Sequence, residues 1–330
     1  MTEEDIEGAL STILIPGVKR NLIQLNMLRE VVIQDGEVKV NLAQAGLEAQ
    51  AKDWVKEKVI AAVKEIPGAG NVEVEISDVK AQEINKIDRI IAVMSGKGGV
   101  GKSLVAGLLG VALARKGKEV GILDADITGP SIPKMFGIGE RPTGAETGIL
   151  PILSRSGIEV ISINLLLPQE DDAVIWRGPL ISKTIQQFWE DVVWGKLDFL
   201  VVDLPPGTAD AALTVMQSLP LSGVIIVSTP QELAAMIVRK AVKMTEKMNT
   251  PVLGVVENMS YFVTPDSGKR IDVFGKSKAQ EMAGAARAPL LAQIPIDPKI
   301  AELCDEGRIE NYDSDILGSF SDKFFEQIGK

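Results

Sequence analysis

One stretch of the sequence constrains the fold more than any other. Residues 96–103 read Gly-Lys-Gly-Gly-Val-Gly-Lys-Ser, between an apolar run at 90–94 and a helix-like stretch at 104–116. A strand, a glycine-rich loop and a helix with this spacing form the pattern of a phosphate-binding loop. The glycines let backbone N–H groups converge on phosphate oxygens, and the helix N-terminus adds partial positive charge. The stretch therefore predicts a site for the phosphates of a nucleotide.

Two side chains of this loop are expected to have separate roles in nucleotide binding. Lys102 is expected to reach the β- and γ-phosphates, and the Ser103 hydroxyl to ligate Mg²⁺. A second lysine, Lys97, lies where ordinary loops of this kind need none. The candidate nucleotide-binding residues are Gly96, Lys97, Gly98, Gly99, Val100, Gly101, Lys102 and Ser103.

Apolar runs alternate with helix-like stretches along the rest of the chain. Strands are predicted at residues 90–94, 119–124, 158–163, 199–203, 223–228, 252–256 and 290–294. Most are continuous aliphatic runs, as expected for parallel strands buried on both faces. Helices are predicted between them, notably at 179–193, 232–248 and 276–286. The alternation predicts an α/β domain over residues 89–330, with a doubly wound, mostly parallel sheet and its ligands at the carboxyl ends of the strands.

Residues 1–80 have a different pattern and predict a small α+β domain. Strand-like runs at 27–33 and 37–42 flank Asp35-Gly36, which is a two-residue hairpin signal. A helix-like stretch at 47–66 and a third strand at 72–76 follow, and the mixed polar residues 81–88 are interpreted as a linker.

Composition excludes several classes of protein. The formal net charge is −10 and neither part of the chain is basic, which argues against nucleic acid as the main partner. No apolar run is long enough to cross a bilayer, so no membrane association is expected. A single cysteine and no histidine argue against disulfides, zinc sites and histidine-based catalysis, and a cytoplasmic location is expected.

Two further apolar strands end in carboxylates. Residues 120–123 run into Asp124-Ala125-Asp126, and residues 199–202 run into Asp203-Leu204-Pro205-Pro206-Gly207. Each acid alone is equally compatible with an ordinary turn or helix cap. Beside a phosphate-binding loop, however, an apolar strand ending in Asp predicts a carboxylate that holds Mg²⁺ or positions water.

Taken together, these motifs resemble the Mrp/ApbC family of P-loop ATPases. This family comprises iron–sulfur cluster carriers related to MinD, ParA and the nitrogenase iron protein. The resemblance covers residues 89–310 and, more weakly, residues 1–80. It is carried by residues 96–103, 124–133, Trp176-Arg177-Gly178-Pro179, 203–208, Thr229-Pro230-Gln231-Glu232, 257–262 and Ile294-Pro295-Ile296-Asp297-Pro298.

The resemblance implies an ATP-hydrolysing homodimer. By position, Lys97 matches the lysine that reaches the phosphates of the partner subunit. Asp126 matches the residue that orients the attacking water, Asp124 supports the metal site, and Asp203 belongs to the second switch. Asn258 is expected to recognise adenine, with the segment at Pro295 beside the base. The catalytic residues so implied are Lys97, Lys102 and Asp126, the metal residues are Ser103, Asp124 and Asp203, and hydrolysis is expected to be slow.

The chain departs from this family where a cluster would bind. Cluster-carrying members have Cys-x-x-Cys after the Ser-Tyr-Phe segment, whereas here Thr264 and Ser267 occupy those positions. Hydroxyls are poor substitutes for thiolates, and Cys304 lies far along the chain. Three hypotheses stay open: an ATPase of iron–sulfur assembly with client or scaffold proteins, a MinD- or ParA-like switch, and a scaffold that barely hydrolyses ATP. A stable cluster held by the usual bridging route is not expected.

Overall fold

The computed structural model describes most of the chain. The described residues are 1–126, 129–166, 178–207, 210–231 and 234–329, without the side chains of residues 178–182. Its contacts divide the chain into two units. The first comprises Met1–Asp88, Arg141–Leu153 and Gln187–Asp198, and the second comprises Arg89–Glu140, Ser154–Gln186 and Phe199–Lys330.

The first unit begins with a small sheet and its helices. In chain order these are α1 (Glu3–Leu10), β1 (Leu28–Gln34), β2 (Glu37–Gln44), α2 (Ala49–Lys64), β3 (Val72–Asp78) and α3 (Ala81–Ile84). The sheet order is β1-β2-β3, with β1 antiparallel and β3 parallel to β2. Asp35 and Gly36 join β1 to β2 with φ angles of 51° and 85°, so the predicted hairpin is confirmed.

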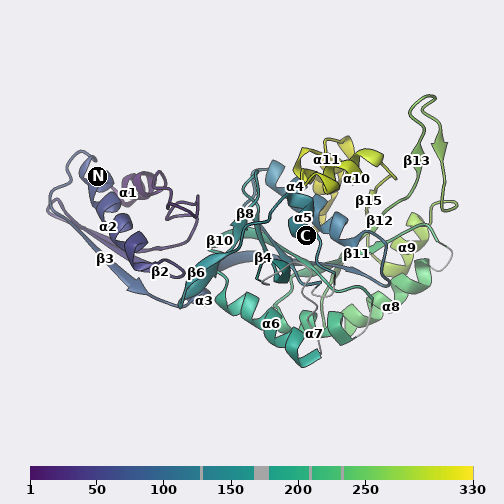
Figure 1. Ribbon diagram of the computed structural model, residues 1–330, viewed down its shortest axis with the longest axis horizontal. Helices are drawn as coiled ribbons and strands as arrows, with labels where there is room; N and C mark the ends of the chain where they lie inside the picture. Colours follow the sequence, from purple (N-terminus) through teal and green to yellow (C-terminus); the bar gives the residue numbers. More distant parts are fainter. Residues whose placement is uncertain (127–128, 167–177, 208–209, 232–233, 330) are drawn as a thin grey trace. The chain divides into compact units, whose positions relative to one another are not determined.

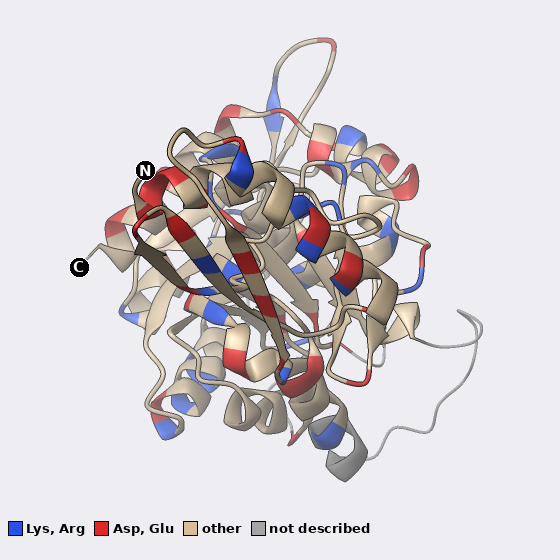
Figure 2. Ribbon diagram, turned by 90° about the vertical axis from the view of Figure 1, so that its left-hand side faces the viewer, with Lys and Arg blue, Asp and Glu red and all other residues tan. Residues whose placement is uncertain are grey.

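Alternation along the strands separates the core of this unit from its polar face. Val38, Val40 and Leu42 of β2 are buried together with Val55 and Val59 of α2. Between them Lys39 points outward and pairs with Glu75 across the strands at 2.8 Å. Figure 2 shows the charged residues spread along these strands. The period of two in the sequence therefore places the apolar side chains against the helix.

Two later segments join the first unit, and no pattern in the sequence had predicted this. One contains the short hairpin of β6 (Thr143–Ala145) and β7 (Gly148–Leu150), whose Leu150 lies in the core of the unit. The other supplies Val193 to the same core. Residues 81–88, predicted as a linker, form α3 and the first residues of β4, and Ala81 and Ile84 are buried.

The remaining elements follow the predicted alternation. They are β4 (Lys86–Ser95), α4 (Lys102–Arg115), β5 (Val120–Asp124), α5 (Ile132–Phe136), β8 (Ile152–Leu153), β9 (Glu159–Ser162), η1 (Ile163–Leu165), α6 (Gly178–Asp191), β10 (Lys196–Asp203), α7 (Asp210–Ser218), β11 (Gly223–Ser228), α8 (Ala234–Lys247), β12 (Val252–Glu257), β13 (Phe262–Val263), β14 (Arg270–Ile271), α9 (Ala279–Ala286), β15 (Leu290–Gln293), α10 (Pro298–Asp305), η2 (Ile309–Asn311) and α11 (Asp315–Ile328).

All seven strands predicted in this part of the chain form, and they lie in one sheet. Its order is β15-β12-β11-β4-β10-β5-β9-β8, with the strand before the glycine-rich loop near the centre. The pairs of β4 with β11, β11 with β12, β12 with β15, β5 with β10 and β5 with β9 are parallel. Figure 1 shows α4, α5, α10 and α11 on one face of the sheet and α7 and α8 on the other. The predicted doubly wound α/β architecture is therefore confirmed.

The helices of the described residues include none that is long and apolar enough to cross a membrane.

Candidate nucleotide site

The glycine-rich loop leaves β4 at Ser95 and enters α4 at Lys102. Gly99 and Gly101 both have φ of 77°, a left-handed conformation that favours glycine. A Cβ on Gly101 would lie 2.2 Å from Asn258 Nδ2, and one on Gly96 would lie 2.0 Å from Ile237 Cγ2. Both the backbone angles and the lack of space therefore require glycine at these positions of the motif.

Lys102 lies at the start of α4 with its side chain only 5% exposed. Its Nζ is 2.5 Å from Asp203 Oδ1, 3.5 Å from Asp126 Oδ2 and 3.3 Å from Ser103 Oγ. The structure thus brings together Lys102, Asp126 and Asp203, which the sequence analysis assigned to one site although they come from separate elements. The ammonium is the positive centre of a cluster of buried carboxylates.

Asp124 and Asp203 are neighbours in register at the carboxyl ends of β5 and β10, and both are fully buried. Asp124 accepts hydrogen bonds from the backbone N–H groups of Ser131 and Ile132 at 3.1 and 3.2 Å. Burial, reinforced by the Asp203 carboxylate, raises the pKa of Asp124 to about 8.

Burial also raises the pKa of Asp203, while the Lys102 ammonium beside it favours the charged form. Its second oxygen, Oδ2, is buried and has no hydrogen-bond partner among the described residues. A buried anionic oxygen next to the loop hydroxyl Ser103 is a donor that suits a hard cation such as Mg²⁺. The residues present therefore fit a nucleotide-bound Mg²⁺, although no three His, Cys, Asp or Glu side chains within the described ranges gather as a metal site by themselves.

Lys97 is half-buried and does not join the Lys102 cluster. Its Nζ donates a hydrogen bond to Gln231 Oε1, in the segment after β11. Asp126, in contrast, is 7% exposed and faces Lys102. The two residues expected to act on the terminal phosphate thus lie in different surroundings, one on the surface and one inside the site.

Asn258 follows β12 and is buried against the loop. Its side-chain amide donates to the carbonyl of Val100 at 2.9 Å, and its backbone N–H donates to Ser228 at 2.8 Å. The segment at Pro295 is half-buried and runs beside it, because the N–H of Ile294 donates to the carbonyl of Glu257 at 2.9 Å. The structure therefore brings together the two segments that were expected to flank the adenine.

Some expected residues lie outside the described part of the chain. These are Trp176 and Arg177 of one motif, Ile127 and Thr128 after Asp126, Thr208 after the Asp203 motif, and Glu232 after Gln231.

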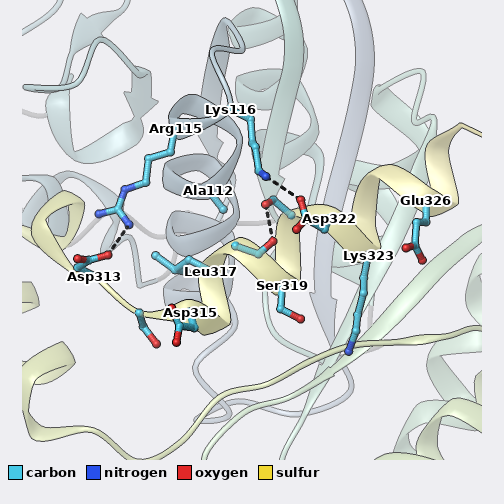
Figure 3. A pocket seen from close by; sticks show the side chains of 13 residues that line it. Ala112, Arg115, Lys116, Asp313, Asp315, Leu317, Ser319, Asp322, Lys323 and Glu326 are labelled. Carbon is cyan, nitrogen blue, oxygen red and sulfur yellow. Dashed lines mark hydrogen bonds and ion pairs between the residues drawn. The ribbon is translucent and has the colours of Figure 1, made fainter.

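A separate groove of about 670 Å³ lies between α4 and α11, at the end of α4 opposite the loop. Figure 3 shows its charged lining, in which Lys116 pairs with Asp322 at 2.7 Å and Arg115 with Asp313 at 3.8 Å. The length of α4 places this groove about 20 Å from Lys102. It is therefore no part of the nucleotide site.

Comparison with known proteins relates this geometry to a family. Residues 86–328 match the model described as "NUBPL iron-transfer P-loop NTPase", and residues 3–76 match the "Iron-sulfur cluster assembly protein" model. The chain belongs to the iron–sulfur carrier family of P-loop NTPases. The carrier protein of Aquifex aeolicus is 38% identical, over 97% of this chain and 96% of its own. That of Escherichia coli is 40% identical, over 92% and 84%.

Solved structures agree with this assignment. A nucleotide-binding protein from Archaeoglobus fulgidus in complex with ADP is 48% identical, covers 73% of this chain and 96% of its own, and has a TM-score of 0.66. MinD of Aquifex aeolicus is 18% identical over 73% of this chain and 97% of its own, with a TM-score of 0.52, which shows the shared fold alone. The comparisons thus favour an iron–sulfur carrier ATPase over a MinD- or ParA-like switch.

The hairpin of β13 and β14 holds the positions where the sequence lacks the cysteines of cluster-carrying members. Thr264 Oγ1 and Ser267 Oγ lie 2.7 Å apart and share a hydrogen bond. The Lys269 N–H also donates to Thr264 Oγ1 at 3.1 Å. Cys304 lies half-buried in α10, where burial raises the pKa of its thiol. The hairpin therefore offers two neighbouring hydroxyls in this carrier-family chain.

Sequence reasoning missed Glu257 and Gln231 as functional candidates. Glu257 is fully buried at the end of β12 and accepts hydrogen bonds from several segments. The signal was available, because an apolar strand ending in a carboxylate is the same pattern that marked Asp124 and Asp203. Gln231 carried no such signal, since only the fold places it beside Lys97.

Proposed function

We propose that this chain is a Mg²⁺-dependent ATPase that works as a cytoplasmic homodimer in iron–sulfur protein assembly. The observation that carries the proposal is the Lys102 ammonium between Asp203 and Asp126, beside a glycine-rich loop that has no room for a side chain at Gly96 or Gly101. Its partners would be iron–sulfur client or scaffold proteins, in keeping with the carrier proteins to which it is similar.

ATP phosphates would replace the carboxylates as the partner of Lys102. Backbone N–H groups of the loop would hold the β-phosphate, and the helix N-terminus would add its partial charge. Ser103, with Asp203 and Asp124, would hold Mg²⁺, which when bound neutralises charge on the β- and γ-phosphate oxygens. Asn258 and the segment at Pro295 would contact the adenine.

Hydrolysis needs a water molecule placed in line with the terminal phosphate. Asp126 lies in the site without being fully buried, and a carboxylate there would orient that water. With no histidine in the chain, it is the best available group for this step, and we expect slow turnover.

Lys97 would complete the site of a second copy. It is half-buried, and its present partner, Gln231, is a neutral, exposed side chain that would exchange for phosphate at little cost. A mobile cation placed on the developing charge of the γ-phosphate acts in the manner of an arginine finger.

An iron–sulfur cluster does not fit the hairpin. A [4Fe–4S] cluster takes four thiolates, and this chain has one cysteine, so a dimer supplies two. We therefore expect the protein to act in assembly without a cluster bridged at Thr264 and Ser267.

Anaerobic reconstitution with iron and sulfide tests this proposal. The parent is expected to stay colourless, while Thr264→Cys with Ser267→Cys should gain a thiolate-bound cluster, because the two side chains are already adjacent. The two cysteines must be kept reduced, because neighbouring thiols oxidise to a disulfide. Each single variant is the matched control and should bind little iron. A parent that takes up about four irons per dimer, with a thiolate charge-transfer spectrum, would refute the expectation that no cluster is bridged at the hairpin.

A further inference from the structure

Glu257 is a buried carboxylate that the proposed mechanism does not use. It is the last residue of β12, is fully buried, and lies in register with Ser228 on one side and Gln293 on the other. It forms no ion pair with any residue that the structure describes. Its charge is instead met by hydrogen bonds from four donors: Ser260 Oγ, Ser277 Oγ at 2.7 Å, the Lys278 N–H at 2.6 Å and Gln293 Nε2 at 2.9 Å. A buried charge costs free energy unless it is met in this way, so the network fixes its members in place.

Three of the four donors flank one segment of the chain, and the fourth, Gln293, lies on β15. Ser260 precedes residues 261–276, which form the β13–β14 hairpin, and Ser277 and Lys278 follow them just before α9. Figure 1 shows this hairpin standing clear of the sheet near β12 and β15. The Glu257 carboxylate therefore links the two ends of the segment 261–276, which contains Thr264 and Ser267.

The same carboxylate adjoins the nucleotide loop. Asn258 is the next residue, and its amide donates to Val100 of the loop. Met259 then adopts a left-handed φ of 54°, which is strained for a bulky side chain and persists only where neighbours hold it. The holding contacts are the Ser260 N–H to Ile294 at 2.9 Å and the Ser260 hydroxyl to Glu257. The turn at 258–260 is thus fixed between the loop and Glu257.

We infer that Glu257 is a positioning residue that couples the nucleotide loop to the hairpin. A change in the loop at Val100 displaces Asn258, and the turn cannot tilt without moving Ser260 and, through the carboxylate, Ser277 and Lys278. Occupancy of the loop then alters the order of residues 261–276. The inference rests on the proposed binding of nucleotide at this loop, and it makes the hairpin an element that responds to ATP.

Hydrogen exchange of the full chain, read by mass spectrometry with and without Mg²⁺ and ATP, tests the coupling. In the wild type, nucleotide should slow exchange in peptides covering 261–276 by about threefold or more. Glu257→Gln keeps the shape but removes the charge that four donors need, so exchange there should be fast and independent of nucleotide. Calorimetry on the same samples should show ATP affinity reduced by less than about tenfold.

Glu281→Gln is the matched control. Glu281 is an exposed carboxylate on α9 that pairs with Lys278 at 3.6 Å, so the variant removes a nearby charge without touching the buried network. It should keep the wild-type response. If Glu257→Gln fails to fold, Ser277→Ala removes a single donor at the second end of the segment 261–276 and should weaken the response there.

Two results would overturn the coupling. One is a wild-type hairpin whose exchange ignores nucleotide that calorimetry shows to be bound. The other is a folded Glu257→Gln or Ser277→Ala protein with the full wild-type response. Failure of the wild type to bind ATP would instead refute the proposed function, so the two failures are distinguished by the binding measurement.

Discussion

Asp124 and Asp203 place two carboxyl groups side by side in the interior of the sheet, where only Lys102 supplies a cation among the described contacts. Such a cluster is electrostatically unfavourable until a nucleotide and its metal ion bind. The unfavourable electrostatic energy therefore belongs to individual carboxyl groups.

One prediction at this scale concerns pH. Burial raises the pKa of Asp124 to about 8, against about 3.9 in an unfolded chain. Between these values the folded protein holds a proton that the unfolded chain releases, so the free energy of unfolding should fall as pH rises from about 4 to 8. Asp124→Asn should flatten this dependence in urea unfolding with EDTA and no nucleotide. Asp266→Asn, an exposed change in the hairpin, should keep the wild-type slope; an equally steep slope in Asp124→Asn would contradict the assignment.

A second prediction concerns the water-orienting carboxylate. Asp126→Asn keeps the size of the side chain and should still bind ATP, because the loop is unchanged and Lys102 keeps its closer ion pair with Asp203. Loss of a positioned general base or water-orienting group costs about 10²–10⁴-fold in turnover. Single-turnover hydrolysis, with binding measured by calorimetry, separates the two effects. Turnover at the wild-type rate would remove Asp126 from the mechanism.

At the level of elements, the loop between β4 and α4 depends on its neighbour after β12. Asn258 occupies the space that a side chain on Gly101 would need, so the shape of the loop and the position of Asn258 are set together. The turn at 258–260 is also held by the hydrogen bond from the Ser260 hydroxyl to Glu257. The nucleotide loop and the hairpin are therefore parts of one packed arrangement.

Gly101→Ala tests this arrangement. The new methyl group would lie 2.2 Å from Asn258 Nδ2 on a residue with φ of 77°, so the loop must distort. We expect ATP affinity to fall by at least about tenfold, since strain of this kind costs on the order of 1–3 kcal/mol. Gly117→Ala is the matched control, because it also has a positive φ of 75° but open space around it at the other end of α4. Equal affinities for ATP in the two variants would show that the contact with Asn258 does not matter.

At the scale of the whole molecule, the proposed site spans two copies of the chain. Lys97 lies on the surface and Lys102 inside, so a complete site would take its outer lysine from the partner. The acidic net charge of −10 opposes association at low salt, and nucleotide charge would add to it. The Lys97 ammonium would then attract the phosphates bound to the other copy and offset this repulsion.

Mixed dimers test this directly. Lys97→Ala and Lys102→Ala proteins should each be nearly inactive, whereas a mixture should recover up to about a quarter of wild-type activity. In a mixed dimer one of the two sites holds both lysines, and half of the dimers in an equal mixture are mixed. Capture of an untagged Lys102→Ala chain by a tagged Lys97→Ala chain, in the presence of ATP, should show that mixed dimers form. If they form and stay inactive, Lys97 does not act across the interface.

Short segments of the sequence were enough to predict the local elements of this protein. The glycine loop, the seven buried strands and the Asp35-Gly36 hairpin each depend on residues close together in the chain, through periodicity, backbone freedom and turn chemistry. These are properties that a short segment carries wherever it is placed. The carboxylates at Asp124, Asp126 and Asp203 were found in the same way, because each follows an apolar run.

Tertiary structure alone decided which of these residues meet. Strand order brings Asp203 beside Lys102 across about one hundred residues, and it seats Gln231 against Lys97. The buried network of Glu257 gathers Ser277 and Gln293 from separate segments, and residues 141–153 join the core of the first unit. The physical reason is that strand order and long-range contacts minimise the exposed apolar area and unmet polar groups of the whole chain, a balance that no single segment contains.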